Sequence, residues 1–152
     1  ISLSHLHEFR VDVEGIVGAK AAEQANKADV ENLEGLLIKI EKILKASTLR
    51  RDKFLEADKE FHQTLAQITG NPIYIFIHKI IHDNIQTYYD EFLQLDEVRL
   101  KENYQDLCDI FESVKNRDVN KARDLAQCHV RKNFRYMNPN QIHLHAELRP
   151  PL

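Results

Sequence analysis

Three polar residues stand where the sequence pattern calls for apolar ones, and their types suggest metal or ligand chemistry. Asp58 falls inside the apolar arc of one helical segment, and His62 follows one turn later on the shoulder of that arc. His129 lies in the middle of the apolar face of a segment much further along the chain. A carboxylate that faces a helical core is costly unless it is paired, hydrogen-bonded or bound to a metal. These three residues are therefore the first candidates for an internal site.

Two further segments add weaker candidates for the same interior. Arg10 flanks the apolar face of the first segment, and Asn84 shares the apolar face of the fourth. Simpler explanations exist, because a single buried histidine is more often a hydrogen-bonded core residue, and Asp58 with His62 can be an ordinary side-chain pair. Four segments that each send a polar group inward nevertheless match what a bundle with an internal ligand or metal site requires.

The other histidines with recognisable patterns are predicted to lie outside this site. His78 and His82 stand four residues apart, but both fall at the edge of their segment, so we expect them at the surface. His143 and His145 belong to a C-terminal stretch without helical periodicity and receive the same interpretation.

Apolar residues recur at intervals of three and four along most of the chain, which predicts helices and not strands. Only four glycines and four prolines punctuate the 152 residues, so turns are few and elements long. Gly70, Asn71 and Pro72 form the clearest boundary, as C′ residue, N-cap and first helical residue. The pattern gives six segments, at roughly 6–25, 26–44, 54–68, 72–93, 100–114 and 118–130. We therefore predict an all-α antiparallel bundle over residues 1–137, followed by a C-terminal tail at 138–152.

Charge and hydropathy exclude several function classes for this segment. Lys and Arg number 21 against 24 Asp and Glu, and the net charge of −3 provides no electrostatic footprint for nucleic acid or an anionic membrane. The longest apolar run, residues 73–77, is far short of the ~20 residues of a membrane-spanning helix. Cys108 and Cys128 are interpreted as buried small hydrophobes of a reducing cytoplasm. Because the chain starts at Ile1 and its sole methionine is Met137, we expect it to be part of a longer protein.

Three stretches carry a resemblance to a known family. They are Glu8-Phe9-Arg10 with Glu14 and Ala21-Ala22, Asp58 to His62 running on to Gly70-Asn71-Pro72, and Asn116-Arg117-Asp118 leading through Ala122 to His129. Together they resemble the FCD effector-binding domain of the FadR subfamily of GntR-type bacterial transcription regulators, over residues 3–137. The resemblance implies a cytoplasmic bundle of six or seven helices that binds a small effector, commonly an organic acid. It also implies a homodimer whose N-terminal winged helix-turn-helix domain, absent from this chain, contacts operator DNA.

The resemblance also implies a metal site, with one departure. Many family members hold a divalent metal between an aspartate and three histidines, and Asp58, His62 and His129 match three of these positions. The remaining histidine usually lies 22 residues before the last one, where this chain has Leu107. Two alternatives follow. Three ligands can hold zinc or nickel with an exchangeable position for the effector, or the site has lost its metal and His62 and His129, with Arg10 and Asn84, bind the effector directly.

Two other function classes compete with a sensor. A metal-dependent helical-bundle enzyme is one, but no histidine has a glutamate three residues before it, as di-iron bundles require, and the H-E-x-x-H motif is absent. The other is a helical interaction module without a ligand, in which the buried polar groups only set the helix register. We therefore predict a ligand-sensing domain that is not an enzyme.

Overall fold

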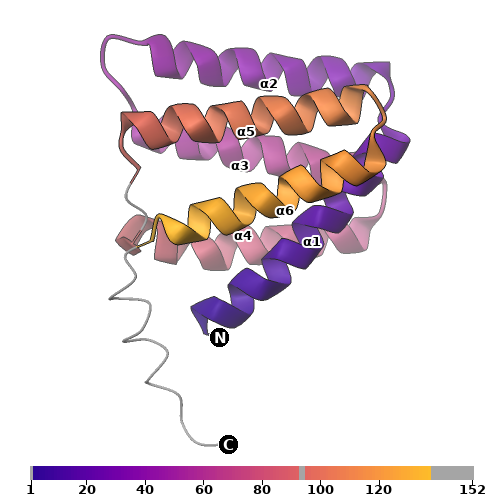
Figure 1. Cartoon of the computed structure of the whole chain (residues 1–152), viewed down its shortest axis with the longest axis horizontal. Helices are drawn as coiled ribbons and strands as arrows, with labels where there is room; N and C mark the ends of the chain where they lie inside the picture. Colours follow the sequence, from indigo (N-terminus) through magenta and orange to yellow (C-terminus); the bar gives the residue numbers. More distant parts are fainter. Residues whose placement is uncertain (1, 93–94, 138–152) are drawn as a thin grey trace, which may run out of the picture.

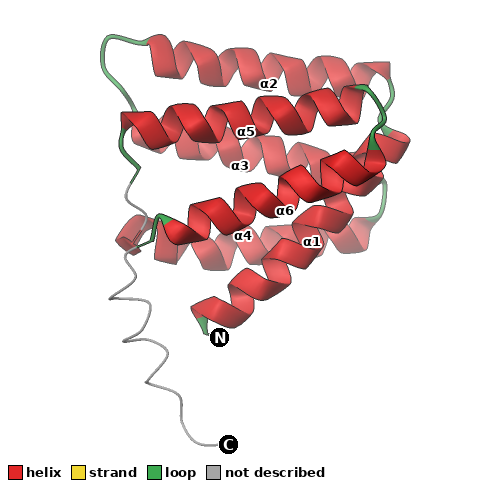
Figure 2. Ribbon diagram, viewed as in Figure 1, coloured by secondary structure: helices red, strands yellow, loops and turns green. Residues whose placement is uncertain are grey.

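The computed structural model describes residues 2–92 and 95–137, and every helix or strand assigned within them is an α-helix (Figures 1 and 2). In chain order the helices are α1 (Leu3–Gln24), α2 (Lys27–Lys45), α3 (Arg51–Ile68), α4 (Pro72–Phe92), α5 (Glu97–Lys115) and α6 (Val119–Arg135). The predicted all-α bundle is confirmed. The predicted tail at 138–152 lies outside the described residues.

Local sequence signals place the helix ends. Asn26 and Asp29 form a reciprocal capping box, in which each side chain accepts a hydrogen bond from the other's backbone N–H at 2.9 Å. At the predicted boundary between α3 and α4, Gly70 has a φ of 62°, in the left-handed region that favours glycine. Asn71 then accepts a hydrogen bond from the backbone N–H of Ile73 at the start of α4.

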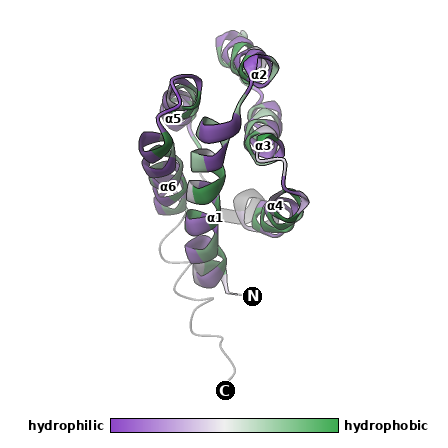
Figure 3. Cartoon of the chain, turned by 90° about the vertical axis from the view of Figure 1, so that its right-hand side faces the viewer, coloured by the Kyte–Doolittle hydropathy of each residue, from purple (hydrophilic) through white to green (hydrophobic). Residues whose placement is uncertain are grey.

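Helix α1 lies at the centre of the bundle. In Figure 3, which is turned by 90° from Figure 1, α5 and α6 lie on one side of the molecule and α2, α3 and α4 on the other. Helix α1 lies between these two groups. Helix α1 packs against α3, α4, α5 and α6, and its buried residues extend around much of its circumference. A polar side chain on α1 can therefore meet groups from both sides of the bundle.

The contact of α1 with α6 depends on glycine. A Cβ atom added at Gly18 would lie 3.0 Å from the backbone oxygen of Ala122 and 3.2 Å from the Cβ of Ala126. A Cβ at Gly15 would lie 2.7 Å from atoms of the Gln127 side chain. We call these five residues the α1–α6 seam. The two backbones approach this closely because the glycines carry no side chain.

The two cysteines differ in their exposure to solvent. Cys108 is half-buried, but Cys128 is exposed on α6, so the prediction that both thiols are buried is wrong for Cys128. The reason is that Cys128 lies next to His129 along the helix, about 100° away from it, and His129 takes the inward position.

Over the described residues, no helix combines the length and the apolar character needed to cross a bilayer.

Candidate metal and effector site

Seven polar side chains are buried together inside the bundle, each at most 4% exposed. They come from α1, α3, α4 and α6, and we call them the polar cluster: Arg10, Glu14, Asp58, His62, His78, His82 and His129. Charged side chains are almost never fully buried unless they are paired. A concentration of this kind therefore makes the polar cluster the candidate functional site.

Helices α3 and α6 bring the three predicted metal-binding residues together. Asp58, His62 and His129 each offer a ligand atom, and these atoms all lie within 4.8 Å of one another. The Nε2 atoms of His62 and His129 face each other at 3.1 Å, and Asp58 Oδ1 lies 3.9 Å from His62 Nε2. We call this group the α3–α6 triad.

Carboxylates lie behind both histidines of the α3–α6 triad. Asp106 Oδ2 is 3.3 Å from His129 Nδ1, and Glu14 Oε2 is 3.4 Å from His62 Nδ1. A carboxylate opposite Nδ1 favours a proton on that nitrogen, which leaves the Nε2 lone pair free to bind a metal. The facing Nε2 atoms of His62 and His129 therefore need an additional proton or a cation between them.

Two buried oxygens near this triad have no hydrogen-bond partner among the described residues. One is Asp58 Oδ1, and the other is Oδ1 of Asn133, whose Nδ2 lies 3.3 Å from His129 Nε2. Unsatisfied buried polar atoms call for an explanation such as an ion. Rotation of the Asn133 amide exchanges its oxygen and nitrogen and would present Oδ1 to the same space. This donor set fits a divalent metal.

Leu107, at the position of the family's remaining histidine, is fully buried in the apolar core. Asp106 and Asn133 were not singled out by the sequence analysis. Asn133 carries a signal that was available, because it lies one turn after His129 on the same helical face. Asp106 carries none, since an acidic residue next to an apolar position is ordinary on a partly exposed helix.

Helix α4 corrects two predictions. His78 and His82 were expected at the surface, but both are buried. Asn84 was expected inside, but it is exposed, and its Nδ2 donates a hydrogen bond to the backbone oxygen of Ile80 in the same helix. The buried face of α4 runs through His78, Ile81, His82 and Ile85. Asn84 lies about 120° around the helix from His78, so it does not reach the polar cluster.

The cause of this error is that α4 is apolar on its exposed face as well. Ile73 and Phe76 are 61% and 62% exposed, and Ile80 is also exposed. A helical wheel assigns the inward direction from the apolar residues. Exposed isoleucines and a phenylalanine therefore turned the predicted inward face away from the two histidines.

His78 and His82 form a second group with Glu14 of α1, which we call the α1–α4 triad. Glu14 Oε1 lies 3.3 Å from His78 Nε2 and 3.2 Å from His82 Nε2. The two imidazole rings stack with centroids 4.1 Å apart. Arg10 Nε is 3.5 Å from the same Glu14 oxygen. Glu14 thus touches both triads, with Oε2 toward His62 and Oε1 toward α4.

Burial and charge shift the pKa values of the cluster in different directions. Burial by itself raises the Glu14 pKa, but the neighbouring His78 and His62 outweigh it and hold this pKa well below its usual range. Burial lowers the His62 pKa, yet Glu14 and Asp58 together raise it above the ordinary value. Burial dominates for His82, whose pKa falls to about 3, and it also lowers the pKa of His129. Glu14 is therefore a carboxylate at neutral pH.

A small surface cavity between α3 and α4 leads to the polar cluster. Its volume is about 180 Å³, and it is lined by Gln63, Ala66, Gln67, Ile75, His78 and Lys79. His78, which is 1% exposed, is part of the lining, so the cavity ends against one residue of the α1–α4 triad. A larger hollow of about 540 Å³ lies over α2 and the start of α3, but none of the cluster residues line it.

A family model for the FCD domain matches residues 5–132. The chain therefore belongs to the FCD domain family, which confirms the resemblance seen in the sequence. It is 27% identical over 133 residues to the HTH-type transcriptional repressor NanR of Cronobacter sakazakii, covering 87% of this chain and 50% of that protein. It is also 28% identical over 133 residues to NanR of Edwardsiella tarda, again covering 87% of this chain and 50% of that protein.

A solved structure, E. coli McbR/YncC, has the same fold, with a TM-score of 0.75 and 14% sequence identity over 95% of this chain and 65% of that chain. The chain spans about half the length of the NanR relatives that it matches.

Proposed function

We propose that this chain is the ligand-sensing domain of a GntR-type transcription regulator that holds a divalent metal, zinc or nickel, in the α3–α6 triad. The observation that carries this proposal is the pair of Nε2 atoms of His62 and His129, which face each other at 3.1 Å with a carboxylate behind each ring. A bound metal would supply a Lewis-acidic centre with an open position. Asp58, His62 and His129 would hold it, and Asn133 lies beside them as an oxygen donor.

The charges of the polar cluster support a cation. Arg10 contributes one positive charge, whereas Glu14 and Asp58 contribute two negative charges, so the cluster with neutral histidines has a net charge of −1. An isolated charge inside a protein is expensive. A divalent cation reverses the sign of the cluster, and its interior then attracts an anion.

The effector in this proposal is a small organic acid whose carboxylate binds the metal and Arg10. Asn84, which the sequence analysis had assigned to the effector, is not included because it lies on the outside of α4. The cavity between α3 and α4, whose lining includes His78, provides the route toward the cluster. Arg10 and Glu14 belong to α1, so an effector that moves them also moves the first helix of the domain.

In this proposal, effector binding changes the affinity for DNA. A winged helix-turn-helix domain would precede α1, and a shift of α1 would change how two such domains are held in a homodimer and hence their affinity for operator DNA. The support is family membership and the names of the NanR relatives, which are called transcriptional repressors. The same support leads us to propose a role that is not enzymatic.

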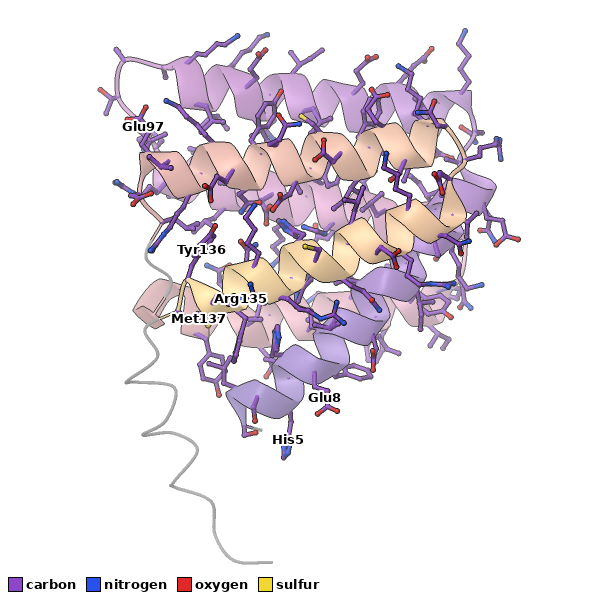
Figure 4. The ribbon with its side chains drawn as sticks, in the orientation of Figure 1. His5, Glu8, Glu97, Arg135, Tyr136 and Met137 are labelled. Carbon is purple, nitrogen blue, oxygen red and sulfur yellow. The ribbon has the colours of Figure 1, made fainter. Side chains whose placement is uncertain are left out.

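Metal analysis of the purified chain tests the proposal. We expect divalent metal in the wild type, and a content lower by one equivalent in Asp58→Ala and in His129→Ala, with His5→Gln as the matched control. His5 is exposed near the start of α1 and points away from the bundle (Figure 4). A panel of sugar acids, hydroxy acids and dicarboxylates, screened by thermal shift with and without metal, then identifies the effector. A metal content in both triad variants equal to that of the wild type would contradict the proposed site.

A further inference from the structure

We propose that the α1–α4 triad is a second cation site, distinct from the α3–α6 triad and separated from it by the ring of His62. His62 Nδ1 faces Glu14, and His62 Nε2 faces Asp58 and His129. The two triads therefore lie on opposite edges of one imidazole. The second site takes a divalent transition metal through Glu14, His78 and His82.

The donor chemistry of the α1–α4 triad suits such an ion. Two imidazole nitrogens and one carboxylate oxygen form a set that holds zinc while leaving a position open for another ligand. His78 and His82 are four residues apart on α4, so one helical face presents both rings. Glu14 comes from α1 and contributes one carboxylate oxygen within 4.8 Å of a ring nitrogen of each histidine.

The distances are compatible with metal ligands, and the His82 pair also lies within hydrogen-bond range. Ligand atoms that lie about 2.0–2.2 Å from a tetrahedral zinc ion are roughly 3.3–3.6 Å from one another. The separations from Glu14 Oε1 to His78 Nε2 and His82 Nε2 are 3.3 Å and 3.2 Å. A charge-assisted hydrogen bond is shorter, at about 2.7–2.9 Å. This carboxylate thus stands off from both rings by about the distance at which a common ion holds its ligands.

His78 supplies an independent observation. It is 1% exposed, and neither of its ring nitrogens has a hydrogen-bond partner among the described residues. Its Nε2 has only the Glu14 oxygen nearby, at 3.3 Å without hydrogen-bond geometry, so the loss of hydration is poorly compensated. A metal on Nε2 accounts for that nitrogen, and the cavity that His78 lines gives the ion an entry from solvent.

The position of Arg10 indicates which triad binds the first metal ion. Its Nε lies 3.5 Å from Glu14 Oε1, so its positive charge opposes a cation at the α1–α4 triad. The α3–α6 triad has its own carboxylate, Asp58, and Asp106 supports His129 from behind. We expect the first equivalent of metal to enter the α3–α6 triad and the second, bound more weakly, to enter the α1–α4 triad.

Cobalt titration of the metal-stripped chain tests this inference. We expect two equivalents of Co²⁺ in the wild type and in His5→Gln, one in His78→Gln, one in His82→Gln and one in His129→Gln. Circular dichroism confirms that each variant is folded. A wild type that binds one equivalent, unchanged in His78→Gln and His82→Gln, would overturn the second site and leave the proposed function intact. One equivalent that is lost in His82→Gln and retained in His129→Gln would instead overturn the α3–α6 metal and support the second site.

Nuclear magnetic resonance of the wild type gives a readout that needs no variant. Large contact shifts occur only in imidazoles that coordinate Co²⁺, whereas His78 and His82, with ring centroids 6.4 and 5.8 Å from that of His62, feel through-space shifts from either site. The first equivalent should therefore give contact-shifted ring signals of two histidines, and the second should add those of His78 and His82. Saturation after the first equivalent, with no contact-shifted signals of His78 and His82, would also overturn the inference.

Discussion

Helix α1 has two neighbouring regions built on opposite principles. Along the α1–α6 seam, glycine removes side chains so that two backbones meet closely. Within about a turn and a half of Gly15 on the same helix, Arg10 and Glu14 place full charges in the interior. The seam gains packing and contains no chemistry, whereas the polar cluster contains chemistry and costs desolvation. This difference shows that close packing explains the seam, whereas the cost of the cluster is what the proposed ligand would offset.

The largest expected effect lies in the seam. Gly18→Leu would force a side chain against the backbone of Ala122, which cannot move aside without moving α6. We expect the free energy of unfolding to fall by about 3 kcal/mol, at the upper end of typical overpacking. Urea denaturation measures it. Metal stoichiometry in the remaining folded protein should not change, and a loss of metal would show that the two regions are not independent.

Two glycine variants serve as matched controls for the seam. Gly15→Ala meets only the flexible side chain of Gln127, so its cost should be small. Gly35→Ala in α2 meets nothing within 4 Å, and it should stabilise the chain by about 0.5–1 kcal/mol because alanine favours the helix. If Gly18→Ala behaves like Gly35→Ala, the close approach is not a requirement of the fold.

The next largest effect concerns the missing ligand. Leu107→His places an imidazole at the family's remaining metal position, on the helix whose Asp106 already contacts His129. We expect tenfold or greater tightening of zinc binding, equivalent to about 1.4 kcal/mol, together with lower stability of the metal-free protein. Competition against a chromophoric chelator measures the affinity. Unchanged affinity would indicate that Asn133 or another group already completes the coordination.

At Asp58 we expect a smaller effect, in which a substitution raises the stability of the metal-free protein. This carboxylate is buried, and its Oδ1 has no hydrogen-bond partner among the described residues. Asp58→Asn removes the charge, so the metal-free protein should gain about 1 kcal/mol of stability while the stabilisation by added zinc disappears. Thermal melting with a chelator and with zinc measures both quantities. A destabilised metal-free variant would assign Asp58 to the fold and not to a ligand.

The smallest effect tests whether acid sensitivity belongs to the cluster alone. His7 stacks on Phe134 at the edge of the bundle, with ring centroids 3.9 Å apart. Partial burial, Arg10 and Arg131 lower its pKa from 6.5 to about 4. The unfolded chain therefore binds a proton first, and stability falls as the pH drops from about 6.5 toward 4.

His7→Phe keeps an aromatic ring stacked on Phe134 and removes the imidazole whose titration makes stability depend on pH. Between pH 7 and pH 5 the variant should lose less unfolding free energy than the wild type, with the exposed His5→Phe as control. Urea denaturation at the two pH values measures the difference. Equal losses in wild type and His7→Phe would place the acid sensitivity elsewhere, for example in His82, whose pKa is about 3.

Sequence reasoning reached Asp58, His62 and His129 because each interrupts an apolar face on its own helix. It missed Glu14 because α1 is buried around much of its circumference, so its apolar face does not define its inward side. It missed His78 and His82 for a different reason. The apolar pattern of α4 covers an exposed face, so the wheel pointed in the wrong direction and placed Asn84 inside. Asp106 and Asn133 could be recognised only once His129 had a position in space.

Local periodicity and helix caps in the sequence were sufficient to predict an all-α chain with six helices, because these signals act over a few neighbouring residues. The residues with metal chemistry on α3 and α6 were also identifiable from type and spacing. Only the tertiary structure decided that α1 runs through the centre, which brings Glu14 to histidines 48 to 68 positions further along the chain. The physical reason is that the buried side of a helix depends on its neighbours, and α1 has neighbours on nearly every side.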